Sequence, residues 1–121
     1  MKYLSPSLEI YKFPVTAITS IINRITGISL SGLFICGGLV CLVEKENELA
    51  SLYKEIPSEY KQNLNYMLLT PAVYHTLGGI RHMVWDSFPE MFLNNKQVKK
   101  SSLALISLTF PVTHFCEKYL L

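Results

Sequence analysis

The chain has 121 residues, of which 50% are hydrophobic and 17% are charged, and its formal net charge is +2. This length suits one small domain, and a nearly neutral charge gives no basic footprint for nucleic acid. Three cysteines without a CxxC pair argue against a disulfide scaffold or a zinc site. A small helical core or a short membrane protein remains, and the distribution of the charged residues decides between them.

Residues 1–13 form a polar tail before the first apolar segment. The segment from Lys2 to Pro14 does not have the typical n-region of a secretory signal. No small-residue cleavage site follows a short apolar stretch either. We therefore expect a tail that is not a secretion signal.

Residues 15–43 are the first predicted membrane helix. Pro14 suits the first turn of a helix, and Ile25 to Val43 is a run of 19 residues without a charge. About 20 helical residues cross a hydrocarbon layer of ~30 Å. Ser20 and Arg24 are four residues apart and share one face. Arg24 either snorkels to the interface or binds a ligand that carries a carboxylate or carbonyl group.

Residues 44–61 are a polar connection, and residues 62–82 are the second predicted membrane helix, in which 19 residues up to Ile80 are uncharged. His75 precedes Arg81 by six residues, which places it ~9 Å along the helix inside the hydrocarbon. Gly78 and Gly79 leave the neighbouring helix surface bare, so that a planar ligand can approach. His75 is then either a hydrogen-bonding residue between helices or an axial ligand of haem iron.

Geometry limits the second ligand of such a haem. Two axial nitrogens lie ~4 Å apart, since each metal–nitrogen bond is about 2 Å. His75 and His82 are ~10 Å apart along one helix, so they cannot bind the same iron. The second ligand is His114, a residue of another chain, or absent.

Residues 83–100 are a second polar connection, and residues 101–118 are the third predicted membrane helix. Its uncharged run, Ser101 to Cys116, has 16 residues, and lysines at both ends can snorkel to the interface. Pro71 and Pro111 are expected to bend their helices, because each removes a backbone donor. His114 and the cysteines are interpreted as packing residues.

Lysine and arginine are distributed unequally between the two ends of these helices. The N-terminal segment through Arg24 and residues 81–100 carry seven, and residues 44–61 and the C-terminal end carry four. The positive-inside rule places the N-terminus on the cytoplasmic or matrix side. The sequence thus predicts an all-α protein with three transmembrane helices; a soluble helical bundle is the weaker alternative.

Three sequence blocks resemble a known family. Ser5–Tyr11 is similar to an S-P-H-L-x-I-Y motif, and Pro14–Gly27 to S-x-x-H-R-x-[ST]-G. His75–Asp86 is similar to H-x-x-x-G-I-R-H-x-x-W-D. The chain resembles the cytochrome b subunit of succinate dehydrogenase, the large membrane anchor of respiratory complex II. That family forms half of a heterodimeric anchor bundle.

The resemblance implies a role for each matching residue. His75 stands where the family places its axial haem b ligand, and the opposite ligand comes from a histidine of the smaller anchor subunit. Ser20 and Arg24 stand where the family lines the ubiquinone pocket near the iron–sulfur subunit, and Arg24 is also near a haem propionate. The remaining matches are pocket or propionate residues (Arg81, His82, Gly78, Gly79) and structural or interfacial residues (Trp85, Asp86).

Two residues depart from the family pattern. Asn23 replaces a histidine beside the arginine, and Ser7 replaces the histidine of the opening motif. An amide neither relays a proton nor carries charge, so the polar contact with the propionate or quinone is expected to differ here.

The function implied by the resemblance is that of an anchor in succinate:ubiquinone oxidoreductase, without a catalytic residue of its own. Flavin and iron–sulfur chemistry belongs to a flavoprotein and an iron–sulfur subunit. Haem b, ubiquinone and membrane lipid are the expected partners. The expected location is the mitochondrial inner membrane with the N-terminus in the matrix, or a bacterial plasma membrane. The alternatives are a structural accessory subunit of a respiratory complex and a fumarate reductase-type anchor.

Overall fold

The computed structural model describes residues 12–120, so the block Ser5–Tyr11, with Ser7, lies outside the described part. Within that part every regular element is a helix, which confirms the all-α prediction. The helices are α1 (Val15–Leu42), α2 (Glu46–Glu55), α3 (Ser58–Ser87), α4 (Pro89–Phe92) and α5 (Asn95–Leu120).

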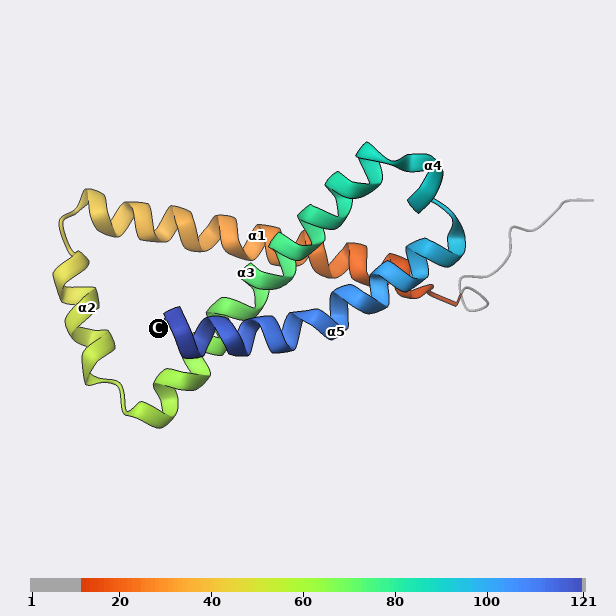
Figure 1. The fold of residues 1–121 in the computed structure, drawn as a ribbon. Helices are drawn as coiled ribbons and strands as arrows, with labels where there is room; N and C mark the ends of the chain where they lie inside the picture. The colour runs from red at the N-terminus through yellow and green to blue at the C-terminus, as the bar shows by residue number, and fades with distance from the viewer. Residues whose placement is uncertain (1–11, 121) are drawn as a thin grey trace, which may run out of the picture.

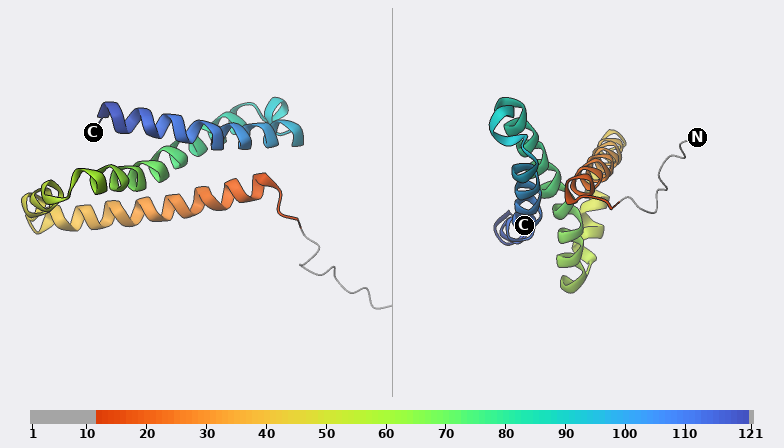
Figure 2. Two further views of the ribbon diagram at one scale, coloured as in Figure 1. Left: turned by 90° about the horizontal axis from the view of Figure 1, so that it is seen from below. Right: turned by 90° about the vertical axis from the view of Figure 1, so that its right-hand side faces the viewer.

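The three long helices alternate in direction (Figure 1). α1 and α5 run the same way and α3 runs back between them. α2 joins α1 to α3 at one end of the molecule, and α4 joins α3 to α5 at the other. Figure 2 shows the same order in two further views. The start of α1 therefore shares an end with α4, and the end of α5 points toward the end that holds α2.

α1 is long and apolar enough to cross a membrane. Only 6% of its most apolar stretch is buried within the chain, whereas the core helix of a soluble protein is mostly buried. Its second half stands apart from the other helices, because a Cβ added at Gly32, Gly37 or Gly38 would have no neighbouring atom within 4 Å. α1 thus offers an apolar surface to its surroundings along most of its length.

The expectation of three such helices is met for α1 only. α3 and α5 contain 30 and 26 residues, but within the described residues only α1 passes the combined test of length and hydropathy. The physical reason is composition: α3 carries Asn, Tyr, His and Thr in its uncharged run, and α5 carries Ser and Thr. Length alone allows both helices to span a bilayer.

The connection 44–61 is not a plain loop, since α2 occupies ten of its residues. Glu46 and Glu48 lie in the first turn and Lys54 in the last, where each charge complements the helix dipole. Ile56, which precedes Pro57, is extended, as expected for a residue before proline. α2 ends there and α3 begins at Ser58.

α3 and α5 are longer than the predicted segments 62–82 and 101–118. α3 continues to Ser87 and ends at Phe88, which precedes Pro89. α5 begins at Asn95, where the Asn94 side-chain oxygen accepts a hydrogen bond from the Lys96 N–H at 3.4 Å. Polar residues of the two connections therefore belong to α3 and α5, because charged side chains do not prevent helix formation outside the bilayer.

The centre of the bundle is polar and its surface is apolar. Thr19 and Ser102 are fully buried, and Thr109 and Thr113 nearly so. Large aliphatic and aromatic side chains are exposed, among them Ile25, Ile28, Phe34, Leu103 and Phe110. Small hydroxyl residues between helices and apolar residues outside are typical of helices packed in lipid.

Candidate functional site

One side of α1 and a single histidine of α3 line an open groove of about 810 Å³. Arg24 is exposed in this groove and His75 is half-buried. The structure therefore brings together two of the residues that sequence reasoning singled out. The lining is Asn23, Arg24, Gly27, Ile28, Ser31, Gly32, Ile35 and His75.

The ring of His75 is held by the backbone of α1. Its Nδ1 lies 3.0 Å from the carbonyl oxygen of Asn23. A carbonyl oxygen only accepts, so a neutral His75 carries its proton on Nδ1 and has its lone pair on Nε2. Within the described part of the chain no hydrogen bond reaches Nε2. Metal-binding histidines commonly donate a hydrogen bond from the N–H of their other ring nitrogen to a carbonyl oxygen in this way.

Gly27 gives the imidazole its place against α1. A Cβ at this position would lie 2.7 Å from Cε1 of His75, which is shorter than real Cβ contacts. Since Gly27 lies one turn beyond Asn23, the same stretch of α1 supplies both the hydrogen-bond acceptor and the space. A side chain at position 27 would have to move the ring.

The two glycines after His75 have different surroundings. Gly78 is buried, and a Cβ there would collide with Oδ1 of Asn23. Gly79 has no atom within 4 Å of its Cβ position. The sequence predicts a bare helix surface at both glycines, and the structure shows one at Gly79. Gly78 instead lies at the contact between α1 and α3 and allows the two helices to pack closely. The buried Oδ1 of Asn23 has no hydrogen-bond partner among the described residues.

Ser20 is half-buried on α1 and does not line the groove. It lies one turn before Arg24, on the same face of the helix. The structure therefore keeps Ser20 and Arg24 as neighbours on α1, but it joins only Arg24 to His75 in one cavity.

Arg81 lies inside the bundle and outside the groove. Its side chain is 9% exposed, its Nη1 donates to Oγ of Ser102 at 3.0 Å, and its guanidinium lies 4.5 Å from the centre of the Trp85 ring. Its Nε is buried without a partner, and no described carboxylate forms an ion pair with it. Arg81 thus joins α3 to α5 within this chain.

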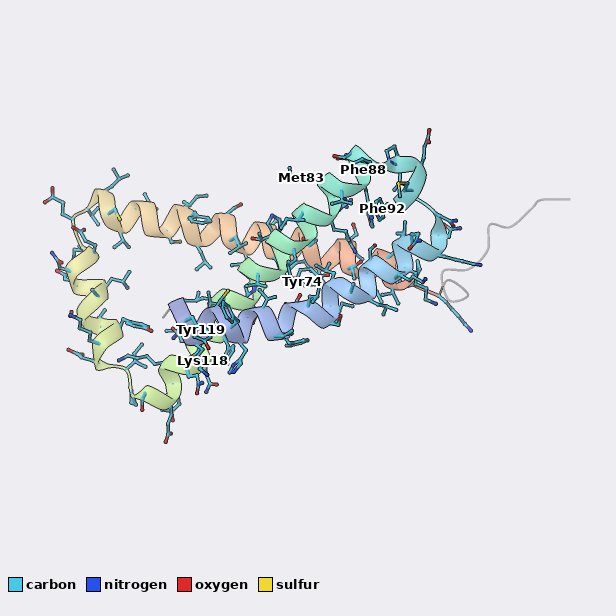
Figure 3. The ribbon with its side chains drawn as sticks, viewed as in Figure 1. Tyr74, Met83, Phe88, Phe92, Lys118 and Tyr119 are labelled. Carbon is cyan, nitrogen blue, oxygen red and sulfur yellow. The ribbon has the colours of Figure 1, made fainter. Side chains whose placement is uncertain are left out.

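A hydroxyl network that sequence reasoning missed links all three long helices. The Tyr74 hydroxyl donates to the Thr19 carbonyl at 3.1 Å, and the Thr19 hydroxyl lies 3.4 Å from Oγ of Ser102. Figure 3 shows Tyr74 near the middle of α3, between α1 and α5 in this view. The available signal was spacing: Ser102, Thr109 and Thr113 recur on one face of α5.

The other singled-out residues lie at the ends of the helices. His82 is exposed and meets the Trp85 ring edge-on at 5.2 Å between centroids, and Asp86 is exposed nearby. Toward the opposite end, Nδ1 of His114 lies 2.6 Å from the Tyr66 hydroxyl. This contact ties α5 to α3, in keeping with a packing role for His114.

The site offers one nitrogen to a metal and no chelating cluster. Among residues 12–120, no group of three or more His, Cys, Asp and Glu side chains could hold a bare ion. A single imidazole with a free Nε2 beside an open groove suits an iron that brings its own equatorial ligands, as in haem. The residues present therefore fit the expected group.

The chain is similar to one family over most of its length. A sequence profile described as the succinate dehydrogenase/fumarate reductase transmembrane subunit matches residues 2–115. The succinate dehydrogenase cytochrome b556 subunit of Paracoccus denitrificans is 36% identical over 110 residues, which are 86% of this chain and 80% of that protein.

Two further relatives extend the comparison. The succinate dehydrogenase cytochrome b560 subunit of Reclinomonas americana is 31% identical over 119 residues, 91% of this chain and 80% of that protein. The mitochondrial cytochrome B subunit of Schizosaccharomyces pombe is 30% identical over 112 residues, 87% of this chain and 61% of that protein. The chain thus spans about three fifths of the yeast relative.

Proposed function

Because the chain belongs to the family of succinate dehydrogenase/fumarate reductase transmembrane subunits, we propose that it is a membrane anchor of a succinate:ubiquinone oxidoreductase. The family is transmembrane, and its members similar to this chain are bacterial and mitochondrial. In this proposal a flavoprotein and an iron–sulfur subunit oxidise succinate. The chain holds them at the mitochondrial inner membrane or a bacterial plasma membrane.

His75 is the proposed axial ligand of haem b. The observation that carries this assignment is the groove in which Nε2 of His75 is free and Nδ1 is bound by the Asn23 carbonyl. Arg24, in the same groove, is the cation suited to a haem propionate. Haem b supplies a one-electron redox centre when bound. A histidine of the smaller anchor subunit is the proposed second ligand, since His82 is exposed elsewhere on α3.

Ser20 and Arg24 are the proposed quinone-binding residues. Reduction of a quinone to a hydroquinone places negative charge on its carbonyl oxygens before protons arrive. A hydroxyl and a guanidinium on one face of α1 are donors for those oxygens. The chain's contribution to the reaction is to bind and orient the quinone, while the electrons come from cofactors of other subunits.

Arg81 and Gly78 take a different place in this proposal from the one that resemblance implied. Within the chain both serve helix packing, Arg81 toward α5 and Gly78 toward α1. Gly79 keeps an open surface beside the site. At the end of the same signature His82 and Asp86 are exposed and Trp85 is half-buried.

The direction of the reaction is a separate question, because the family description includes fumarate reductase. The same anchor geometry serves both directions. We propose succinate oxidation because all three relatives named above are succinate dehydrogenase subunits.

The test is the haem spectrum of the purified complex. His75→Ala should abolish the b-type absorbance and the pyridine-hemochrome signal, since no other described residue of the groove ligates iron. His114→Ala is the matched control, because His114 bonds Tyr66 away from the groove, and it should retain the signal. An unchanged spectrum in His75→Ala complexes would disprove the ligand assignment.

A further inference from the structure

Two consecutive residues of α3 form hydrogen bonds with two carbonyls one turn apart on α1. The Tyr74 hydroxyl donates to the Thr19 oxygen at 3.1 Å, and His75 Nδ1 lies 3.0 Å from the Asn23 oxygen. Thr19 and Asn23 are four residues apart, so their carbonyls lie ~6 Å apart on one face of α1. The two donors therefore contact α1 at two points along its axis.

Each of these carbonyls belongs to a residue that directly precedes a proposed quinone-binding residue. Thr19 precedes Ser20, and Asn23 precedes Arg24. Because a helix moves as a rigid rod over one turn, a shift of α1 that lengthened one hydrogen bond would displace both side chains. The imidazole and the quinone-binding face are thus fixed by the same pair of contacts.

The first of the two contacts is also held from the third helix. The Thr19 hydroxyl lies 3.4 Å from Oγ of Ser102, which accepts from Arg81 Nη1 at 3.0 Å. Thr19 and Ser102 are fully buried, and Tyr74 is 6% exposed. The Tyr74 end of the pair is therefore dry, whereas the His75 end opens on the groove. A dry hydrogen bond is the better candidate for holding the alignment.

We propose that Tyr74 is a positioning residue that holds α1 in register with α3, and so couples the orientation of His75 to the placement of Ser20 and Arg24. This inference rests on the proposed function of those three residues. Tyr74 touches neither haem nor quinone in this role. Its hydroxyl acts through the Thr19 carbonyl.

Tyr74→Phe removes that hydroxyl and keeps the ring, and Tyr66→Phe is the matched control. Tyr66 is also on α3 and also forms a side-chain hydrogen bond, but with His114 toward the other end of the helix. In the assembled complex, Tyr74→Phe should raise the quinone KM three- to tenfold at unchanged turnover with an artificial acceptor. Redox titration of the b-type absorbance should show a shifted midpoint potential of the haem. If the variant changes the ratio of the affinities of the site for ferric and ferrous haem tenfold, the midpoint potential changes by about 59 mV.

Tyr66→Phe should leave both the midpoint and the quinone KM at their unmutated values. A purely structural role for Tyr74 would lower the thermal stability of the complex without moving either quantity. That result, obtained while the unmutated complex has haem and reduces quinone, would overturn the positioning role and leave the proposed function standing. An unmutated complex without a b-type spectrum and without quinone reductase activity would instead overturn the proposed function.

Discussion

At the scale of single residues, Gly27 has the most specific consequence for the site. Replacing it with alanine places a Cβ 2.7 Å from Cε1 of His75, so the imidazole must rotate or α3 must retreat. We expect Gly27→Ala to reduce the haem content of the complex severalfold. The measurement is b-type absorbance per complex, with the amount of complex taken from total protein.

Gly37→Ala is the control for this substitution. It makes the same chemical change on the same helix, at a position outside the groove lining with no atom within 4 Å. Alanine is favoured over glycine in a helix by up to about 1 kcal/mol, so this variant should keep its haem and its stability. Equal haem loss in both variants would contradict a specific role for the Gly27 contact.

Residue types and their spacing predict some of the residues at the groove. Ser20 with Arg24, and His75 with its glycines, could be recognised because their chemistry is unusual in an apolar helix. The burial of Arg81 and the bond from Tyr74 to Thr19 could not be predicted. Both depend on how α1, α3 and α5 rotate about their axes, and one sequence with weak periodicity does not determine that rotation.

At the scale of helices, α5 is held by a buried charge. Ser102 accepts a hydrogen bond from Arg81 and lies against the Thr19 hydroxyl. Ser102→Ala should lower the free energy of unfolding by about 1–3 kcal/mol, because it leaves a buried guanidinium donor unsatisfied. Denaturation of the complex in mixed detergent micelles measures the change.

Ser107→Ala provides the comparison on the same helix. Ser107 is exposed and bonds only the Ala104 carbonyl within α5. Its loss should change the free energy of unfolding by less than about 0.5 kcal/mol, as for other exposed substitutions. If Ser102→Ala and Ser107→Ala lower the free energy of unfolding by the same amount, the interhelical network does not stabilise α5.

The ends of the helices could be predicted from the sequence only in part. The sequence predicts the first helix at residues 15–43, and α1 ends one residue earlier, at Leu42. The agreement is close because a proline marks the start of this helix and a charge-free run marks its extent. The uncharged runs do not predict α2, nor the parts of α3 and α5 that lie beyond residues 62–82 and 101–118. An uncharged run indicates which residues can contact lipid, and it does not indicate where a helix ends. Capping by Asn94 and the prolines at 57 and 89 sets those ends.

At the scale of the molecule, polar residues lie inside and apolar residues outside. This arrangement explains why, among the helices of residues 12–120, hydropathy identifies α1 and not α3 or α5 as a candidate span. α3 and α5 use their Ser, Thr, Tyr and Arg side chains to bind each other and α1, so their average composition is more polar than that of a lone span. Helices that cross a membrane as part of a bundle can carry such residues when they face the interior.

Alternation of the three long helices predicts the membrane topology. Residues 44–61 and 83–100 lie at opposite ends of α3, and the second of these connections shares its end with the start of α1. If α3 crosses the bilayer, Glu48→Cys and Lys96→Cys should react with a membrane-impermeant maleimide from opposite sides. The background for both variants replaces Cys36, Cys41 and Cys116 with serine.

In sealed vesicles of known orientation, Lys96→Cys should be labelled from the matrix or cytoplasmic side. The positive-inside rule predicts this, since residues 1–24 and 81–100 hold seven of the eleven lysine and arginine residues of the sequence. Glu48→Cys should be labelled only from the other side. Labelling of both positions from one side would show that α3 does not cross. Because α1 and α5 both run opposite to α3, that result would also remove the basis for assigning three spans.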